Sequence, residues 1–277
     1  ASYPPLLKEI HLPPPILSRK GEIQPEDRIA AGIVGTRFCS YYGKIITPRF
    51  AGELARTGVT IVSGLAKGID FLAHREALAA GGRTIAVVGS GLDRESFYPP
   101  EHWDFSKDIT QRGAVLTEFP PGVPALPRHF PQRNRIIAGL SLGVLVIEAP
   151  EKSGALLTAE LALEQNRTVY AVPGPITARS SEGTNALIKL GAKPITRAAE
   201  ILEDLRLQAM PVPPRLIELT DPTEKAVFEH LSAEEPVHVD DLAKAVNISP
   251  AALNATLAVL EVKGAVRNLG ANHFVRT

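Results

Sequence analysis

Short runs of consecutive apolar residues alternate with longer stretches of helical periodicity between Ile29 and Leu205. Because the apolar residues follow one another instead of alternating with polar ones, the runs are typical of strands that helices cover on both faces. The pattern predicts an α/β fold with a doubly wound, mainly parallel sheet of six or seven strands. The predicted strands are Ala31–Val34, Val59–Val62, Thr84–Val88, Ala114–Thr117, Val144–Glu148 and Thr168–Val172.

Proline clusters divide the chain into four parts. Proline supplies 24 of the 277 residues, and the pairs and triplets before residue 16 disfavour a helix, so the first part is expected to be extended. A proline-rich stretch without apolar periodicity ends near residue 222 and is interpreted as a linker. The predicted parts are an extended N-terminal segment (1–28), the sheet domain (29–205), a proline-rich linker (206–222) and a second small domain (223–277).

The last part has the pattern of three helices followed by a hairpin, which predicts a small C-terminal winged-helix domain. From Asp221 onward it carries five Lys and Arg against eight Asp and Glu, and its third helix, Ser249–Val262, holds no cation. A helix that reads the major groove needs cations for the phosphates, so this domain is interpreted as a protein-contact or spacer module. Duplex contact through Arg267, His273 and Arg276 is the alternative.

Charge and cysteine content exclude several classes of protein. The 30 Lys and Arg balance 30 Asp and Glu, so any nucleic-acid affinity must come from a local patch and not from overall charge. The single cysteine, Cys39, cannot form an internal disulfide or a multi-thiolate metal site, which is typical of a reducing compartment. No apolar run approaches the ~18 residues of a membrane span and no leader opens the chain, so we expect a cytoplasmic protein without a membrane partner.

Glycine, hydroxyl and cationic residues follow the predicted strands at one edge of the sheet. Because the carboxyl ends of parallel strands share an edge, these loops are expected to converge on one binding site. Glycine lets the backbone approach a phosphate, while a hydroxyl and a cation complete its cradle, so the site is predicted to bind phosphate. The residues are Gly35, Thr36 and Arg37 after the first strand, Ser63, Gly64 and Lys67 after the second, and Ser153 and Gly154 after the fifth.

The densest cationic cluster lies in residues 128–135, which hold three arginines and one phenylalanine. Unpaired bases stack on aromatic faces and arginines bind phosphates, so this cluster is predicted to contact single-stranded nucleic acid. The candidate residues are Phe130, Arg133, Asn134 and Arg135. The alternative is a solvated helix start whose arginines pair with acids, and a buried arginine there is expected to pair with Glu118 or Glu148.

Three glycine-rich motifs and one histidine lack the context that their usual chemistry requires. Gly89–Gly91 misses the third glycine of a dinucleotide fingerprint, Gly64–Gly68 has the wrong spacing for a nucleoside-triphosphate loop, and Gly139–Gly143 precedes a strand where a nucleophile elbow must follow one. His74 falls four residues after Asp70 and is expected to form a helix hydrogen bond instead of binding a metal. We therefore predict no metal site, no cofactor and no catalytic residue.

Six motifs occur in order over some 160 residues. They are IVGTR at Ile33–Arg37, SGLAKGID at Ser63–Asp70, TIAVVGSGLD at Thr84–Asp93, FPQRNRIIAGLS at Phe130–Ser141, EAPEKSGALLTA at Glu148–Ala159 and VPGPITARSSEGTNALIKLGA at Val172–Ala192. Together they resemble the DNA-processing protein A family (DprA, also called Smf). The proline-rich start and the terminal domain resemble the family as well, so the likeness covers almost the whole chain. From this sequence we expect no counterpart of the small N-terminal helical domain that many members carry.

This resemblance implies a Rossmann-like core that binds single-stranded DNA in a basic pocket, forms a homodimer and loads the RecA recombinase during natural transformation. It further implies binding without sequence specificity, protection of the strand, single-stranded DNA-binding protein as another partner, and no enzymatic activity. The family's pocket maps onto Arg37, Lys67, Phe130, Arg133, Asn134 and Arg135, and its dimer contact maps onto Leu187 and Ile188.

A remoter similarity to phosphoribohydrolases, which share this core type, keeps a nucleotide N-glycosidase as an alternative function. Those enzymes need a Pro-Gly-Gly string, and a Gly-Thr pair followed by a catalytic glutamate. Here residues 173–175 are Pro-Gly-Pro, and Gly183-Thr184 is followed by Asn185, so the acid is absent. A duplex-binding regulator that acts through the winged helix is the other alternative.

Overall fold

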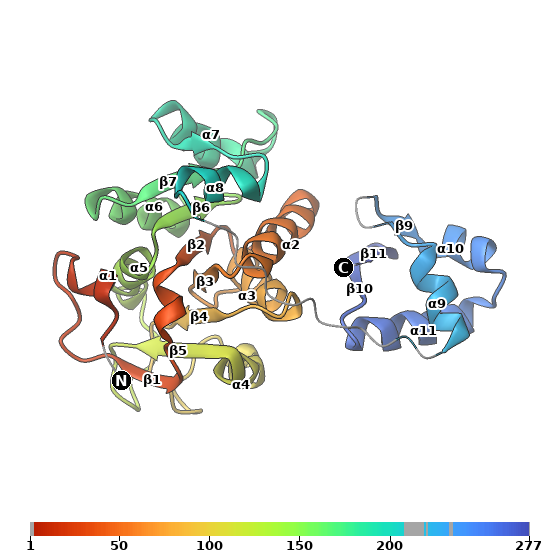
Figure 1. Ribbon diagram of the computed structural model, residues 1–277, viewed down its shortest axis with the longest axis horizontal. Coiled ribbons are helices and arrows are strands. Elements are labelled where there is room, and N and C mark those ends of the chain that lie inside the picture. Colours follow the sequence, from red (N-terminus) through yellow and green to blue (C-terminus); the bar gives the residue numbers. More distant parts are fainter. Residues whose placement is uncertain (1–2, 208–218, 220, 233–234, 277) are drawn as a thin grey trace. The chain divides into compact units, whose positions relative to one another are not determined.

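The computed structural model describes residues 3–207, 219, 221–232 and 235–276 of the chain. The chain divides into two compact units, Ala1–Pro214 and Arg215–Thr277 (Figure 1). Most of the predicted linker, residues 206–222, lies outside the described residues.

An eight-stranded sheet forms the centre of the first unit. Seven strands run parallel, and β1 at one border pairs antiparallel with β5. The spatial order is β1 (Ser18–Gly21), β5 (Gly113–Thr117), β4 (Thr84–Val87), β3 (Thr60–Ser63), β2 (Ala30–Val34), β6 (Gly143–Val146), β7 (Thr168–Ala171) and β8 (Lys193–Pro194). The prediction of a doubly wound, mainly parallel sheet is confirmed.

The prediction of six or seven strands is wrong because both border strands lack an apolar run. Strand β1 contains Arg19 and Lys20, which are both exposed, and β8 is the exposed pair Lys193–Pro194. A run of consecutive apolar residues is expected only in a strand that helices cover on both faces. Strands at the border of a sheet are less covered, so they can contain charged residues and proline.

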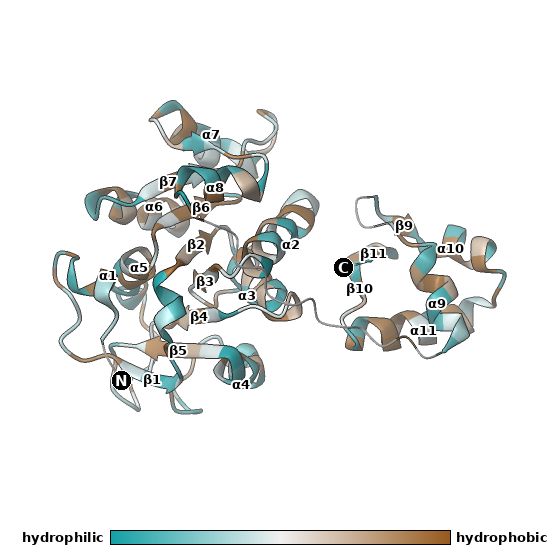
Figure 2. Ribbon diagram, viewed as in Figure 1, coloured by the Kyte–Doolittle hydropathy of each residue, from teal (hydrophilic) through white to brown (hydrophobic). Residues whose placement is uncertain are grey.

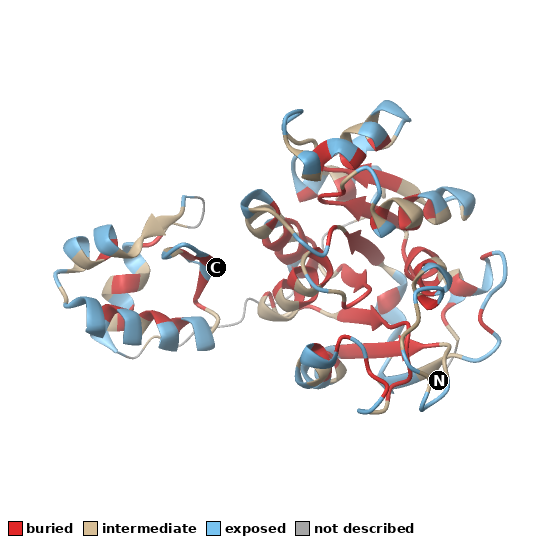
Figure 3. Ribbon diagram, turned by 180° about the vertical axis from the view of Figure 1, so that it is seen from behind, coloured by how far each residue is buried: buried red, intermediate tan, exposed pale blue. Residues whose placement is uncertain are grey.

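Helices cover both faces of the sheet, with α2 and α3 on the right and α5 and α6 on the left of Figure 1. Neighbouring strand residues point to opposite faces, so Ile33 packs toward α2 and α3 while Val34 packs toward α5 and α6. The central strands are therefore apolar and buried throughout (Figures 2 and 3). The helices of this unit are α1 (Pro5–Lys8), α2 (Tyr41–Arg56), α3 (Ile69–Ala79), α4 (Trp103–Arg112), α5 (His129–Leu140), α6 (Gly154–Glu164), α7 (Glu182–Lys189) and α8 (Ala198–Asp204).

The N-terminal segment is not extended throughout, contrary to the prediction for residues 1–28. It contains the short helix α1, the strand β1 and a single 3-10 turn, Pro25–Arg28. Proline is tolerated in the first turn of a helix because its missing N–H has no partner there, so Pro5 begins α1 without cost. Leu7 is fully buried against α5, where Gly139 has no room for a side chain: a Cβ there would lie 2.8 Å from Leu7. This contact explains why position 139, the first residue of the Gly139–Gly143 motif, is a glycine.

The strand order reverses beside β2. From β2 the chain adds β3, β4 and β5 outward on one side, then returns across the sheet to place β6 on the other side of β2. The loops that follow β2 and β6 therefore diverge to opposite faces. In open parallel sheets this divergence opens a crevice at the carboxyl ends of the strands, where ligands bind.

The second unit is a winged helix, as predicted. Its elements are α9 (Pro222–Glu229), β9 (Val237–His238), α10 (Val239–Val246), α11 (Pro250–Val262), β10 (Val266–Gly270) and β11 (His273–Arg276). The Ser249 hydroxyl caps α11 by accepting from the Ala252 N–H at 3.3 Å, and leucines of α10 and α11 form the core. Arg267 is only 9% exposed, so the duplex contact considered for it is not supported.

Among the described residues no single helix has the length and hydropathy of a membrane span. Helices α10 and α11 meet both criteria only when taken together, and a bend of 106° separates them.

Candidate nucleic-acid interface

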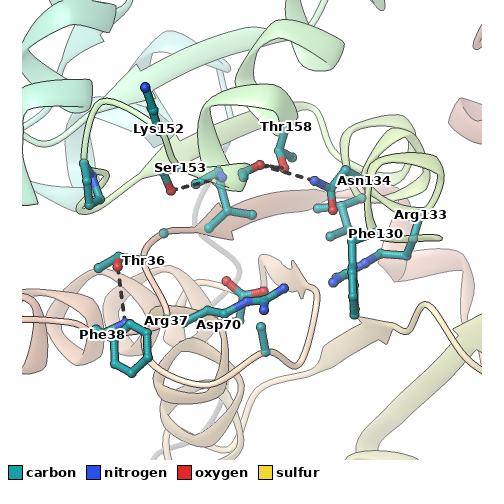
Figure 4. Close-up of a pocket in the computed structure, with 17 residues that line it drawn as sticks. Thr36, Arg37, Phe38, Asp70, Phe130, Arg133, Asn134, Lys152, Ser153 and Thr158 are labelled. Carbon is teal, nitrogen blue, oxygen red and sulfur yellow. Dashed lines mark hydrogen bonds between the residues drawn. The ribbon is translucent and has the colours of Figure 1, made fainter. Parts of the chain in front are cut away.

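A cavity of about 320 Å³ lies at the point where the strand order reverses. Its walls are the loops after β2, β3 and β6, and the first turns of α3, α5 and α6 (Figure 4). The cavity residues that the argument below uses are Arg37, Asp70, Phe130, Arg133, Ser153 and Gly154. The loops after the first, second and fifth predicted strands therefore do converge on one cavity, and the second loop reaches it through Ala66 and not through Lys67.

Arg37 is held at the mouth of the cavity by a rigid loop. The Thr36 N–H donates to the backbone carbonyl of Glu148 at 2.8 Å, and the Glu148 carboxylate accepts from the Ser40 N–H at 2.9 Å. The same carboxylate accepts from the Ser180 hydroxyl at 2.9 Å, so one buried acid fixes segments from three parts of the chain. The helix α2 begins one residue after Ser40, and its N-terminus favours this negative charge.

Arg133 forms the inner cationic wall of the cavity. Its side chain is buried, with 5% of the residue exposed, and its guanidinium lies directly on Gly64. The Nε and Nη1 atoms are buried and have no hydrogen-bond partner among the described residues. Burial lowers the pKa of Arg133 to about 10, still far above neutrality, so the side chain remains a cation. A buried cation with unused N–H groups is costly unless an anion approaches it.

Asp70 lies beneath the two arginines, on the first turn of α3. Its carboxylate accepts from the Gly64 N–H at 3.0 Å and so fixes the loop on which Arg133 rests. Burial raises the pKa of Asp70, and the charge of Arg133 opposes that rise. The guanidinium groups of Arg37 and Arg133 approach this region from opposite sides (Figure 4). The cavity floor thus combines two cations with one carboxylate.

The hydrogen bond expected between Asp70 and His74 is absent, because each side chain has a partner in another segment. The His74 ring pairs through Nδ1 with the Thr84 hydroxyl at 2.6 Å. His74 is fully buried, and this burial, assisted by the charge of Arg133, lowers its pKa to about 3. The imidazole is therefore neutral and structural at physiological pH.

Two helix N-termini and one aromatic ring complete the cavity. Phe130 is half-buried, and the Arg37 guanidinium lies 5.0 Å from its ring centre, within the range of a cation–π contact. The Asn134 amide donates to the Gly154 carbonyl at 3.3 Å and so joins α5 to the start of α6. The Ser153 hydroxyl caps α6. The backbone N–H groups at a helix start attract anions, so the cavity offers both a stacking surface and an anion site.

Several predicted site residues have other roles. Lys67 is paired with Glu101 at the exposed surface and does not line the cavity, and the Ser63 hydroxyl donates to the Ile33 carbonyl at 2.6 Å inside the fold. Arg135 pairs with Glu118 at 2.6 Å, which was one of the two partners considered for an arginine of this cluster. These contacts could not be predicted from loop position because they depend on what packs opposite each loop.

Both candidate dimer residues pack against their own chain. Leu187 on α7 is 8% exposed and belongs to the core between the sheet and α5 and α6. Ile188 is partly buried against the same core. Leu190, the C-cap of α7, is 84% exposed, so a dimer contact at this helix stays a prediction.

Phe38, Asp70 and Lys152 line the cavity and were not among the sequence-based candidates. Phe38 is 89% exposed at the rim, next to Arg37, and Asp70 forms part of the floor. The signal for Asp70 was available, since an acid directly after a glycine-rich loop is a common way to hold that loop at a helix N-terminus. Lys152 also lines the cavity, but its ammonium points away from the other cations (Figure 4).

Comparison with protein families gives two matches that together cover most of the chain. Residues 1–206 match the family described as DNA recombination-mediator protein A, and residues 208–272 match the DprA winged helix domain. Protein Smf from Escherichia coli is 46% identical over 205 residues, which are 74% of this chain and 54% of that protein. DNA processing protein DprA from Bacillus subtilis is 42% identical over 221 residues, which are 79% of this chain and 71% of that protein. This chain thus spans about half the length of the E. coli relative.

Two solved structures share both the fold and substantial sequence identity. DprA from Streptococcus pneumoniae superimposes with a TM-score of 0.69 at 43% identity, covering 73% of this chain and 70% of that one. DNA processing protein A from Helicobacter pylori, whose structure concerns its single-stranded DNA binding mode, gives a TM-score of 0.67 at 30% identity. It covers 74% of this chain and 94% of that one.

Proposed function

Because the chain belongs to the DNA recombination-mediator protein A family, we propose that its cavity binds single-stranded DNA through backbone charge, without reading the base sequence. The observation that carries this proposal is Arg133, a buried cation whose Nε and Nη1 groups have no partner among the described residues. A strand that brings a phosphate to the cavity supplies acceptor oxygens for these N–H groups. The binding mode named for the H. pylori relative supports the same ligand.

The cavity suits unpaired DNA because its groups recognise features that every nucleotide has. Phosphates meet Arg37 and Arg133, and any base can stack on Phe130. With Lys67 and Arg135 each paired to an acid, about three cations remain for phosphates when Lys152 is included. At ~0.7 per phosphate on single strands, the logarithm of the binding constant is expected to fall with the logarithm of salt concentration at a slope of about −2.

The wider role follows from the family and is part of the same proposal. The protein protects incoming single strands and loads the RecA recombinase onto them during natural transformation, acting as a cytoplasmic homodimer with single-stranded DNA-binding protein as a further partner. No chemical step and no cofactor are proposed. Because Leu187 is 8% exposed, a dimer contact on α7 would use mainly Ile188 and the neighbouring Leu190, which is 84% exposed.

Fluorescence anisotropy with one labelled strand, tested alone and as a duplex, measures the proposed binding directly. Wild type is expected to prefer the single strand, and Arg37→Ala to weaken that binding about equally for homopolymers of different bases. Arg56→Ala is the matched control, because Arg56 is exposed at the opposite end of α2, about 24 Å along the helix axis from its start. Equal affinity of Arg37→Ala and Arg56→Ala would refute the assignment of this cavity.

A further inference from the structure

We propose that the cavity is a mononucleotide site, which binds free nucleoside 5′-monophosphates in competition with single-stranded DNA. The inference rests on the proposed function, because it assigns a second ligand class to the same site. It predicts that binding of a strand responds to the concentration of free nucleotides, which are the products of DNA degradation.

The first argument is size. A volume of about 320 Å³ stands at the lower end of the roughly 300–1,000 Å³ found for small-molecule sites. Such a space accommodates one nucleotide, whereas proteins that follow a strand use grooves that hold about four nucleotides or more. The cavity is therefore a pocket for a single unit, and that unit can be a free molecule as well as part of a chain.

The second argument is charge. A phosphate monoester carries about −2 at neutral pH and three acceptor oxygens, whereas a phosphodiester inside a strand carries −1. The deepest cation, Arg133, is buried and has unused N–H groups, and Arg37 approaches it from the opposite side. Asp70, the carboxylate of the floor, is turned to the Gly64 N–H. With Asp70 counted, the charged residues that line the cavity are three cations, Arg37, Arg133 and Lys152, against one carboxylate, a net charge of +2 that one dianion matches.

The third argument is the uncovered start of α6, a helix of 11 residues. A Cβ built on Gly154, its first residue, would meet no heavy atom within 4 Å, so the space in front of the helix is open. Gly154 lines the same cavity as the unpartnered Arg133. The Ala155 and Leu156 N–H groups donate to Ser153, so a phosphate in this space meets the Gly154 N–H on one side and arginines on the other. Phe130 offers its ring to the base.

A competition experiment with the full chain tests the inference. A labelled single strand is bound to the protein, and four unlabelled compounds are titrated against it: deoxyadenosine 5′-monophosphate, deoxythymidine 5′-monophosphate, deoxyadenosine and inorganic phosphate. Both monophosphates are expected to displace the strand competitively, with dissociation constants between about 10 µM and 1 mM. Inorganic phosphate is expected to be at least tenfold weaker because it lacks the base, and deoxyadenosine is expected not to compete. Calorimetric titration of each monophosphate without DNA gives an independent binding constant.

Two variants separate the contributions of the base and the phosphate. Phe130→Ala is expected to bring both monophosphates close to the affinity of inorganic phosphate, and Arg133→Gln to abolish monophosphate binding, with circular dichroism reporting whether each variant folds. If monophosphates at 20-fold the upper expected constant leave a bound strand in place, the inference is overturned while DNA binding stands. Monophosphate binding without strand binding would instead overturn the proposed function and retain the mononucleotide site.

Discussion

Replacing Gly64 by alanine is expected to disable Arg133 without changing any charged residue. A Cβ on Gly64 would lie 1.5 Å from Nη1 and 2.4 Å from Cζ of Arg133, far inside van der Waals contact. The backbone at Gly64 does not require positive φ, so alanine fits the loop itself and the guanidinium must move. The substitution therefore acts on the position of one cation.

The size of the effect follows from the contact that is lost. A hydrogen bond to a charged group contributes about 1.5–3 kcal/mol. Its loss is equivalent to single-strand binding that is about 10- to 150-fold weaker. Fluorescence anisotropy at fixed salt concentration measures the change. Gly52→Ala is the control, because it makes the same substitution inside helix α2 without a clash. A Cβ at Gly52 would lie 3.4 Å from its nearest atom, which belongs to Arg56.

A double-mutant cycle decides whether Gly64 acts through Arg133. Once Arg133 is already alanine, nothing remains for the Gly64 methyl group to displace, so Gly64→Ala/Arg133→Ala is expected to bind as Arg133→Ala does. If the two substitutions instead weaken binding additively, Gly64 acts on the strand by a separate route and the account of the cavity floor is incorrect.

Two further predictions concern the stability of the site. The pKa of His74 is lowered from 6.5 to about 3 in the folded protein. Below pH 6.5 the histidine is therefore protonated in the unfolded chain and not in the folded one, which lowers the free energy of unfolding by about 2 kcal/mol at pH 5. Urea denaturation is expected to show this loss of stability in wild type and not in His74→Asn. The variant is needed as a comparison because the raised pKa of Asp70 makes that group stabilise the fold as the pH falls. Glu148→Gln is expected to lower the free energy of unfolding by about 1–3 kcal/mol, because an amide cannot accept from Ser40 and Ser180 as the carboxylate does. An unchanged denaturation midpoint in that variant would contradict the anchoring of the Arg37 loop.

Sequence patterns predicted the central strands and the edge at which the site lies, because both depend on local features. Strands such as β2 and β6 must be apolar on consecutive residues when helices cover both faces, and their following loops must meet at the carboxyl edge. The strand order was not predictable in this way. That order places β2 beside β6. The loops after these two strands meet through the contact of Ser40 with Glu148, which are 108 residues apart in the sequence, and the cavity lies between these loops.

The roles of individual cations were the least predictable part of the site. Lys67 and Arg133 both follow or flank glycine-rich motifs, yet Lys67 pairs with Glu101 and Arg133 lies buried on Gly64. The difference arises from packing between segments far apart in the sequence, which no periodicity records. The same holds for α7, where Leu187 packs into the core while Leu190 is 84% exposed.

The two border strands limit how copies of this protein can meet. At one border β1 is four residues long and displays Arg19 and Lys20, and at the other β8 ends in Pro194, which has no N–H to offer a neighbour. Charged, short or proline-containing borders prevent a sheet from continuing into another molecule. Neither border strand therefore favours a β-sheet that continues into a second molecule. Any self-association of the sheet domain is expected to use its helices and loops.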